Sequence, residues 1–218
     1  MSGEARRDRR DDRDHPPVPP AGSPTLSPGL VAKLGRASLD PSDGEVGALD
    51  SLARAGLPVP EGFVLTREAH ERFLLCGRGS RDEELDSRVL RALLDLGTAR
   101  VAVVSEGYRR RGLGTVPAVF TAIEGAWLDR GPVRPVLVRR EPDAKCVVRV
   151  SGKTLVPVEA GGPENREEIL RLTRAVEGAL EERFRLEWAL EGGTWWLLSA
   201  LPEGETRSRR GSKRRRRA

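Results

Sequence analysis

The sequence contains few of the residues that build metal sites and nucleophilic active sites. Only two cysteines and two histidines occur among its 218 residues. Cys76 and Cys146 lie far apart, without metal-ligand spacing, so we expect reduced thiols rather than a disulfide. These counts exclude a Ser-His-Asp or Cys-His catalytic arrangement and a cysteine-histidine metal cluster.

The sequence also lacks a long apolar run. No stretch approaches the roughly 20 residues that a membrane-spanning helix needs, and the N-terminus is charged. We therefore expect a soluble, cytoplasmic protein with no membrane partner. Hydrophobic residues make up 38% of the chain, which is enough for a folded core.

Acidic residues are absent from the C-terminal end. Residues 206–218 hold eight Lys or Arg, so the net charge of +5 leaves the rest of the chain at −3. The sequence predicts disorder at 204–218, and at 1–30, where Arg, Asp and Pro predominate. The basic tail has two interpretations: a non-specific contact with nucleic acid or another polyanion, or a solubilising end. The folded body is expected at 31–203.

Helical patterns recur in this body. Ser42 and Glu45 have capping-box spacing and predict a helix at 43–55. Thr66 predicts the start of a second helix, with Ala69, Phe73 and Leu74 on its apolar face, and Asp82 the start of a third. We also expect helices at 118–128 and 169–180. His70 is interpreted as a helix-surface residue.

Short strands separate the helices. Apolar runs predict strands at 62–65, 101–104, 136–138 and 146–150. The end of the body reads as a hairpin, with strands at 185–190 and 194–198 around a Gly192-Gly193 turn. Mixed helices and strands ending in a hairpin predict an α/β or α+β domain.

Residues 52–66, LARAGLPVPEGFVLT, carry the first resemblance to a known family. They resemble the "AGLPVPPGFVLTTEAY" stretch near the start of phosphoenolpyruvate synthases, pyruvate phosphate dikinases and rifampicin phosphotransferases. Residues 184–202, FRLEWALEGGTWWLLSALP, are similar to the "DIEWALDGGELYILQSRP" stretch of the same family. The strand at 135–139 resembles a third family segment.

The resemblance implies a shortened ATP-grasp domain, the nucleotide-binding domain of the dikinase family. It implies that ATP and Mg²⁺ are bound and that phosphate passes to a histidine on a separate phosphohistidine-domain or phosphoenolpyruvate-utilising partner. It places the following residues at nucleotide-binding positions: Glu45, Ser105, Arg139, Glu187 and Ser199. It also places Glu187 at a carboxylate position that binds metal.

Several cationic positions of the family are changed in this chain. Glu45 stands where the family has a phosphate-binding lysine, and Val104 and Leu201 stand where it has arginines. Arg185 replaces an acid two residues before Glu187. Because phosphoryl transfer depends on neutralising the phosphates, we expect phosphotransferase activity to be weakened or lost, as in a pseudoenzyme.

Residues 108–115, YRRRGLGT, support an alternative. They are similar to the acetyl-CoA pyrophosphate loop of GNAT N-acetyltransferases, in which backbone N–H groups and a helix N-terminus contact the phosphates. This alternative gives the following site residues: Arg109, Arg110, Arg111, Gly112 and Gly114. It leaves both flanking resemblances unexplained, and residues 42–96 are more helical than that fold requires.

Overall fold

The computed structural model describes residues 29–76, 82–128, 132–151, 154–157 and 166–203. The predicted basic tail at 204–218 lies outside these residues, as does the predicted N-terminal arm up to residue 28. Leu30, at the end of that arm, is buried in the core. Within the described ranges, no helix is long and apolar enough to cross a lipid bilayer.

The first of two antiparallel sheets has five strands in the order β1-β2-β5-β3-β4. The strands are β1 (Val31–Lys33), β2 (Gly62–Leu65), β3 (Val101–Ser105), β4 (Tyr108–Leu113) and β5 (Val136–Arg140). The central strands β2, β3 and β5 are buried and mostly apolar, as expected for strands covered on both sides.

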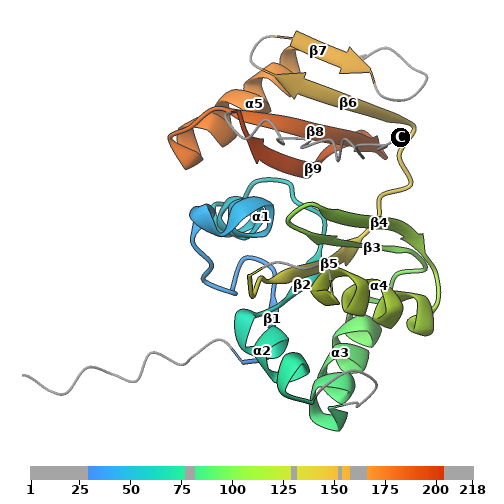
Figure 1. The fold of residues 1–218 in the computed structure, drawn as a ribbon. Coiled ribbons are helices and arrows are strands. Elements are labelled where there is room, and N and C mark those ends of the chain that lie inside the picture. Colours follow the sequence, from blue (N-terminus) through green and yellow to red (C-terminus); the bar gives the residue numbers. More distant parts are fainter. Residues whose placement is uncertain (1–28, 77–81, 129–131, 152–153, 158–165, 204–218) are drawn as a thin grey trace, which may run out of the picture.

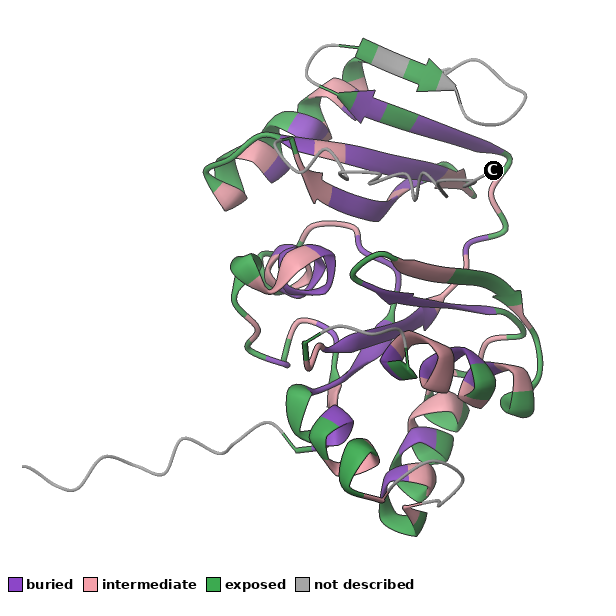
Figure 2. Cartoon of the chain, in the orientation of Figure 1, coloured by how far each residue is buried: buried purple, intermediate pink, exposed green. Residues whose placement is uncertain are grey.

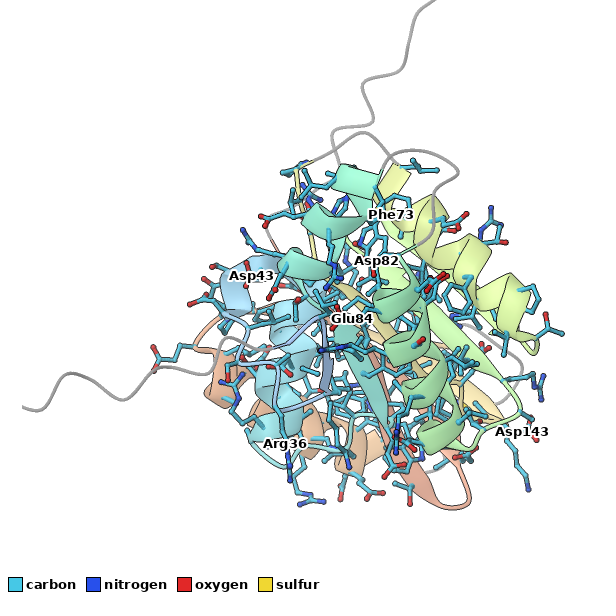
Figure 3. All side chains as sticks on the ribbon, turned by 90° about the horizontal axis from the view of Figure 1, so that it is seen from below. Arg36, Asp43, Phe73, Asp82, Glu84 and Asp143 are labelled. Carbon is cyan, nitrogen blue, oxygen red and sulfur yellow. The ribbon has the colours of Figure 1, made fainter. Side chains whose placement is uncertain are left out.

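Three helices cover one face of this sheet: α2 (Arg67–Cys76), α3 (Glu83–Leu96) and α4 (Val116–Leu128) (Figure 1). Asp82 caps α3, because its carboxylate accepts from the backbone N–H groups of Glu84 and Leu85 (Figure 3). The predicted start of this helix is thus confirmed, as is the Thr66 cap of α2.

The second sheet has four strands in the order β7-β6-β8-β9. The strands are β6 (Cys146–Ser151), β7 (Thr154–Pro157), β8 (Phe184–Glu191) and β9 (Thr194–Pro202), and α5 (Arg166–Leu180) packs against them. Gly192 and Gly193 have φ angles of 58° and 83°, so the predicted terminal hairpin and its glycine turn are confirmed.

Helix α1 (Gly44–Arg54) joins the two sheets into one body. Figure 1 shows it between them, and Figure 2 shows that its inner face is buried. Leu49 and Leu52 pack in a single cluster with Leu137 of the first sheet and Trp188 of the second. This shared core packs the two sheets against α1 and so fixes their relative position. The predicted α+β fold class is confirmed.

The start of α1 differs from the prediction. The capping box is formed by Asp40 and Asp43 around a 3₁₀ turn, η1 (Pro41–Asp43), rather than by Ser42 and Glu45. Asp40 is better placed because it lies outside the turn in an extended conformation and can accept from the N–H of Ser42. The carboxylate of Glu45 is left free to point away from the helix end.

The predicted phosphate loop at 109–115 is largely a strand. Ser105 pairs with Tyr108, so Glu106 and Gly107 form a two-residue turn and residues 108–113 return along the sheet as β4. Gly107 has a φ of 76°, which suits such a turn. The Arg-Arg-Arg-Gly run therefore does not form the strand-loop-helix unit of the acetyltransferase alternative.

Two side chains of α2 also differ from the prediction. Leu74 is 51% exposed, so it does not belong to the apolar face. His70 is only 3% exposed, because it points inward and stacks on Trp127 with the ring centroids 5.3 Å apart. The other two predicted residues, Ala69 and Phe73, do pack in the core, so the buried face includes His70 in place of Leu74.

Candidate functional site

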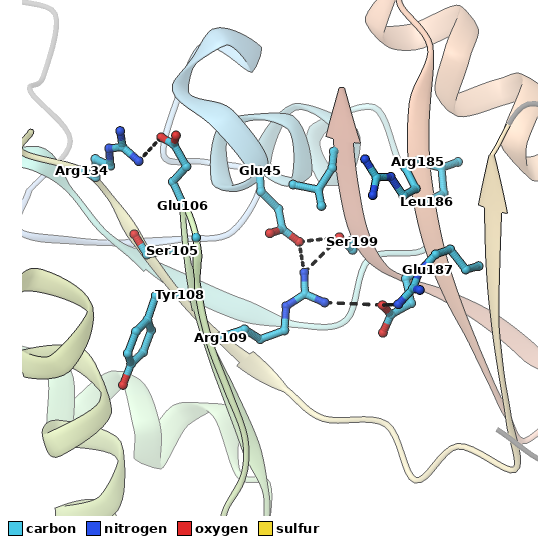
Figure 4. A pocket seen from close by; sticks show the side chains of 13 residues that line it. Glu45, Ser105, Glu106, Tyr108, Arg109, Arg134, Arg185, Leu186, Glu187 and Ser199 are labelled. Atoms are coloured by element: carbon cyan, nitrogen blue, oxygen red, sulfur yellow. Dashed lines mark hydrogen bonds and ion pairs between the residues drawn. The ribbon is translucent and has the colours of Figure 1, made fainter. Parts of the chain in front are cut away.

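A cavity of about 880 Å³ lies between the two sheets. It is bordered by α1, by the β3–β4 hairpin of the first sheet, and by β6, β8 and β9 of the second (Figure 4). The polar and charged side chains that line it are Glu45, Ser105, Glu106, Tyr108, Arg109, Arg134, Arg149, Arg185, Glu187 and Ser199. Its volume is within the range of small-molecule and cofactor sites.

Arg109 contacts several of the other polar side chains in this cavity. Its guanidinium forms an ion pair with Glu45 of α1 and donates to the Ser199 hydroxyl of β9 over 2.9 Å. The Ser199 hydroxyl in turn donates to Glu45 over 2.6 Å. Arg109 also lies 3.6 Å from a carboxylate oxygen of Glu187. One arginine of the first sheet thus contacts α1 and two strands of the second sheet.

Glu187 lies among several guanidiniums. Arg111 forms an ion pair with it, and Arg149 and Arg109 each approach to 3.6 Å. Burial raises the pKa of Glu187, but the positive charges of these arginines and the hydrogen bond from Arg111 outweigh burial and hold its pKa below the usual value. Glu187 is therefore a carboxylate at neutral pH.

Arg139 lies behind the cavity rather than on its surface. Its side chain is 1% exposed and donates to the backbone carbonyls of Leu198 and Arg140, over 3.2 and 3.3 Å. Burial lowers its pKa to about 10, and the nearby charges of Arg109 and Arg111 add to that effect. Arg139 is therefore not part of the cavity wall, and its side chain links β5 to β9.

The other four residues predicted from the dikinase resemblance line one cavity. Glu45, Ser105, Glu187 and Ser199 come from four different elements, and the fold brings them together. Ser105 donates to the carbonyl of Pro135 over 3.1 Å, so its hydroxyl hydrogen is already used within the protein. Glu106 and Arg134 form a separate ion pair near Ser105 (Figure 4).

Residues predicted for the acetyl-CoA alternative are divided between the two faces of β4. Arg109 and Arg111 point toward the second sheet, as residues two apart on a strand do. Arg110 points the other way, with its guanidinium 6.0 Å from the Tyr108 ring centroid. The backbone N–H of Gly112 donates to Glu141. Gly112 and Gly114 are absent from the cavity wall.

Sequence reasoning did not identify Arg149 as a site residue, and noted Arg185 only as the replacement of an acid. Arg149 is the cross-strand partner of Glu187, and Arg185 precedes Glu187 by two residues on the same strand. Side chains alternate along β8, so Arg185 and Glu187 lie on one face, and the sequence alone could have predicted Arg185 as a site residue. The pairing of β6 with β8, which adds Arg149, was not.

The residues present do not fit a magnesium ion. Mg²⁺ binds through carboxylate and other oxygen ligands, usually one or two protein carboxylates. Here Glu187 is surrounded by three guanidiniums, whose charges repel a divalent cation. Across the described ranges, no group of three or more His, Cys, Asp or Glu residues is placed to hold a metal ion. In this structure the contacts of Glu187 are ion pairs with arginines.

Comparison with known proteins gives information on the fold. No protein-family model and no curated protein matches the sequence. Among solved structures, a D-alanine–D-alanine ligase from Bacillus anthracis complexed with ATP is similar, with a TM-score of 0.51 and 12% identity over 78% of this chain and 55% of the ligase. A second structure of that ligase gives a TM-score of 0.50 and 11% identity, over 78% and 58% of the two chains.

This chain has an ATP-grasp-like fold. It spans somewhat more than half the length of the ligases it matches. At this level of identity the similarity establishes the fold alone. These two ligase structures do not bear on the dikinase family in particular, so that resemblance stays a prediction.

Proposed function

We propose that this ATP-grasp-like chain is a nucleotide-binding domain of the dikinase type that binds the phosphates of ATP between its two sheets but does not transfer them. The observation that carries the proposal is the position of Arg109. Its guanidinium occupies the cavity beside Glu45, the residue that stands at the family's lysine position. A cation is therefore present next to that position, although it comes from β4 rather than from α1.

Three observations support nucleotide binding. The cavity volume of about 880 Å³ is sufficient for a nucleotide. Its wall carries four arginines, which recognise phosphate oxygens through planar, paired N–H donors. A similar fold, that of the ligase from Bacillus anthracis, has been solved in complex with ATP.

Other features argue against phosphoryl transfer. Glu45 compensates the charge of Arg109, so this cation is only partly available to a phosphate group. Val104, at a position where the family has an arginine, is fully buried in the apolar core. Each lost contact with developing charge raises the barrier by roughly 3 kcal/mol, so several such losses together remove most of the rate enhancement. The site also does not fit the magnesium ion on which such transfer depends.

The test combines calorimetric titration with a phosphate-release assay on the full chain. We expect weak ATP binding at low ionic strength, further weakened in Arg109→Gln, with no ATP turnover above that of buffer. Arg110→Gln is the matched control, because it removes the same charge from the opposite face of β4. Steady ATP hydrolysis, or transfer of phosphate to a histidine-bearing protein, would contradict the loss of catalysis. Equal ATP affinity in the Arg109→Gln variant and the wild type would place the nucleotide elsewhere.

A further inference from the structure

The second sheet contributes two arginines to the cavity that are not neutralised within it. Arg149 and Arg185 lie on β6 and β8, and both line the cavity beside Glu187. The side chain of Arg149 is half exposed, and the nearest carboxylate oxygen that it pairs with, on Glu187, is 3.6 Å away. Arg185 forms no hydrogen bond or ion pair with any residue in the described part of the chain.

The charges around Glu187 do not balance. Four guanidiniums, those of Arg109, Arg111, Arg149 and Arg185, face two carboxylates, those of Glu45 and Glu187. The buried Arg139 adds a further positive charge behind them. This part of the cavity therefore has a positive potential. Arg109 and Arg111 are held by Glu45 and Glu187, so an anion that enters the cavity finds Arg149 and Arg185 as the available donors.

We propose that the cavity binds a phosphate-bearing anion in its metal-free form, with Arg149 and Arg185 supplying the positive charge that a divalent metal would otherwise bring. This inference rests on the proposed function, because it concerns the same cavity. The shared chemistry of the ligand is a chain of phosphate groups. The adenosine of a nucleotide is not required by the arginines themselves.

The physical reason is that guanidinium groups and a magnesium ion would neutralise the same negative charge on the phosphates. A metal-bound triphosphate arrives with part of its negative charge already neutralised, so its attraction to guanidiniums is weaker than that of the free anion. The net positive charge of the cavity, to which Arg149 and Arg185 contribute, would also repel a magnesium ion carried in with the phosphates. Guanidinium groups, in contrast, match the geometry of phosphate oxygens and need no change of protonation.

The experiment measures ATP binding by calorimetry to the full chain, once with EDTA and once with excess Mg²⁺ at equal ionic strength. We expect a Kd several-fold lower with EDTA. In EDTA, Arg149→Gln and Arg185→Gln should each weaken binding roughly fivefold to tenfold, as expected for the loss of one charge-assisted contact. Arg183→Gln is the matched control, since it removes the same charge two residues before Arg185 and outside the cavity.

The outcomes distinguish failure of the metal-free inference from failure of the proposed function. ATP binding that requires Mg²⁺ would overturn the metal-free inference and leave the proposed function standing. Absence of binding under both conditions would overturn both. Equal affinity in Arg149→Gln, Arg185→Gln and Arg183→Gln would overturn the assignment to this cavity, and deletion of residues 206–218 would then show whether the basic tail holds the anion. Inorganic tripolyphosphate provides the second arm: affinity equal to that of ATP supports the phosphate site and contradicts a nucleotide-specific function.

Discussion

Arg111 of β4 and Glu187 of β8 form an ion pair that connects the two sheets across the cavity. Glu187 is largely buried, while a third of the Arg111 side chain is exposed to solvent. The residues are 76 positions apart in the sequence. The stability that this contact contributes is therefore one measure of how the first sheet is held against the second.

A double-mutant cycle on this pair should show a favourable coupling. We expect Glu187→Gln and Arg111→Gln each to lower the free energy of unfolding by about 1–2 kcal/mol, less than for a fully buried pair because Arg111 is partly solvated. The coupling energy should be about 1 kcal/mol, measured by urea denaturation. Arg110→Gln, on the outer face of β4, should change stability by less than about 0.5 kcal/mol. Additive effects of the two mutations would mean that the pair contributes no net stability.

Removing the acid at position 45 should strengthen ATP binding. In the wild type, Glu45 and a phosphate compete for the guanidinium of Arg109. Glu45→Gln removes this competitor and one negative charge, while Ser199 still accepts a hydrogen bond from Arg109. We expect roughly fivefold tighter binding by calorimetry, equivalent to about 1 kcal/mol. Glu61→Gln, which removes an acid outside this cavity, is the control. Unchanged affinity in Glu45→Gln would show that Arg109 does not contact the ligand.

Asp50 should be more important for stability than any surface ion pair. This carboxylate of α1 is fully buried and accepts from three backbone N–H groups, those of Gly35, Ala37 and Leu39, over 2.6 to 3.3 Å. Asp50→Ala leaves these donors without a partner, which should cost about 3 kcal/mol or more. Arg54 also pairs with Asp50, but its side chain is 47% exposed, so Arg54→Ala should cost at most about 1 kcal/mol. Equal losses in thermal or urea unfolding would contradict this account.

His70 should make the fold sensitive to mild acid. Burial lowers the pKa of His70, and this effect outweighs the opposing influence of the nearby backbone of Trp127 and Arg134. The neutral ring accepts from the N–H of Arg134 over 3.1 Å. Because the unfolded chain binds a proton near pH 6.5 and the folded chain only below that value, stability is complete above about pH 6.5 and falls as the pH drops through this range.

Two measurements check the behaviour of His70. Only two histidines are present, so NMR titration should resolve His70 and give it a pKa below 6.5. In His70→Gln, the loss of stability between pH 7 and pH 5.5 should be smaller than in the wild type. A His70 pKa at or above 6.5 would be incompatible with a buried, neutral ring.

Much of the fold was predictable because the relevant signals are local. Apolar runs predicted β2, β3, β5 and β6, and the paired glycines predicted the final hairpin. The β3–β4 hairpin was not predicted, because the Arg-rich composition of β4 gives it no apolar stripe. Such a strand is stabilised by pairing with β3 and by ion pairs to the second sheet, which are contacts that a sequence window does not contain.

The candidate site shows the same division between local and long-range information. The sequence by itself determined that Glu187 follows Arg185 by two residues in a predicted strand, and its resemblance to the dikinase family is what drew attention to Glu45. Only the tertiary structure decided that Arg109 reaches Glu45, that Arg111 and Arg149 approach Glu187, and that Arg139 is buried behind them. Charge pairing acts through space over a few ångströms, so which charges compensate one another depends on how the sheets pack, not on the order of the residues.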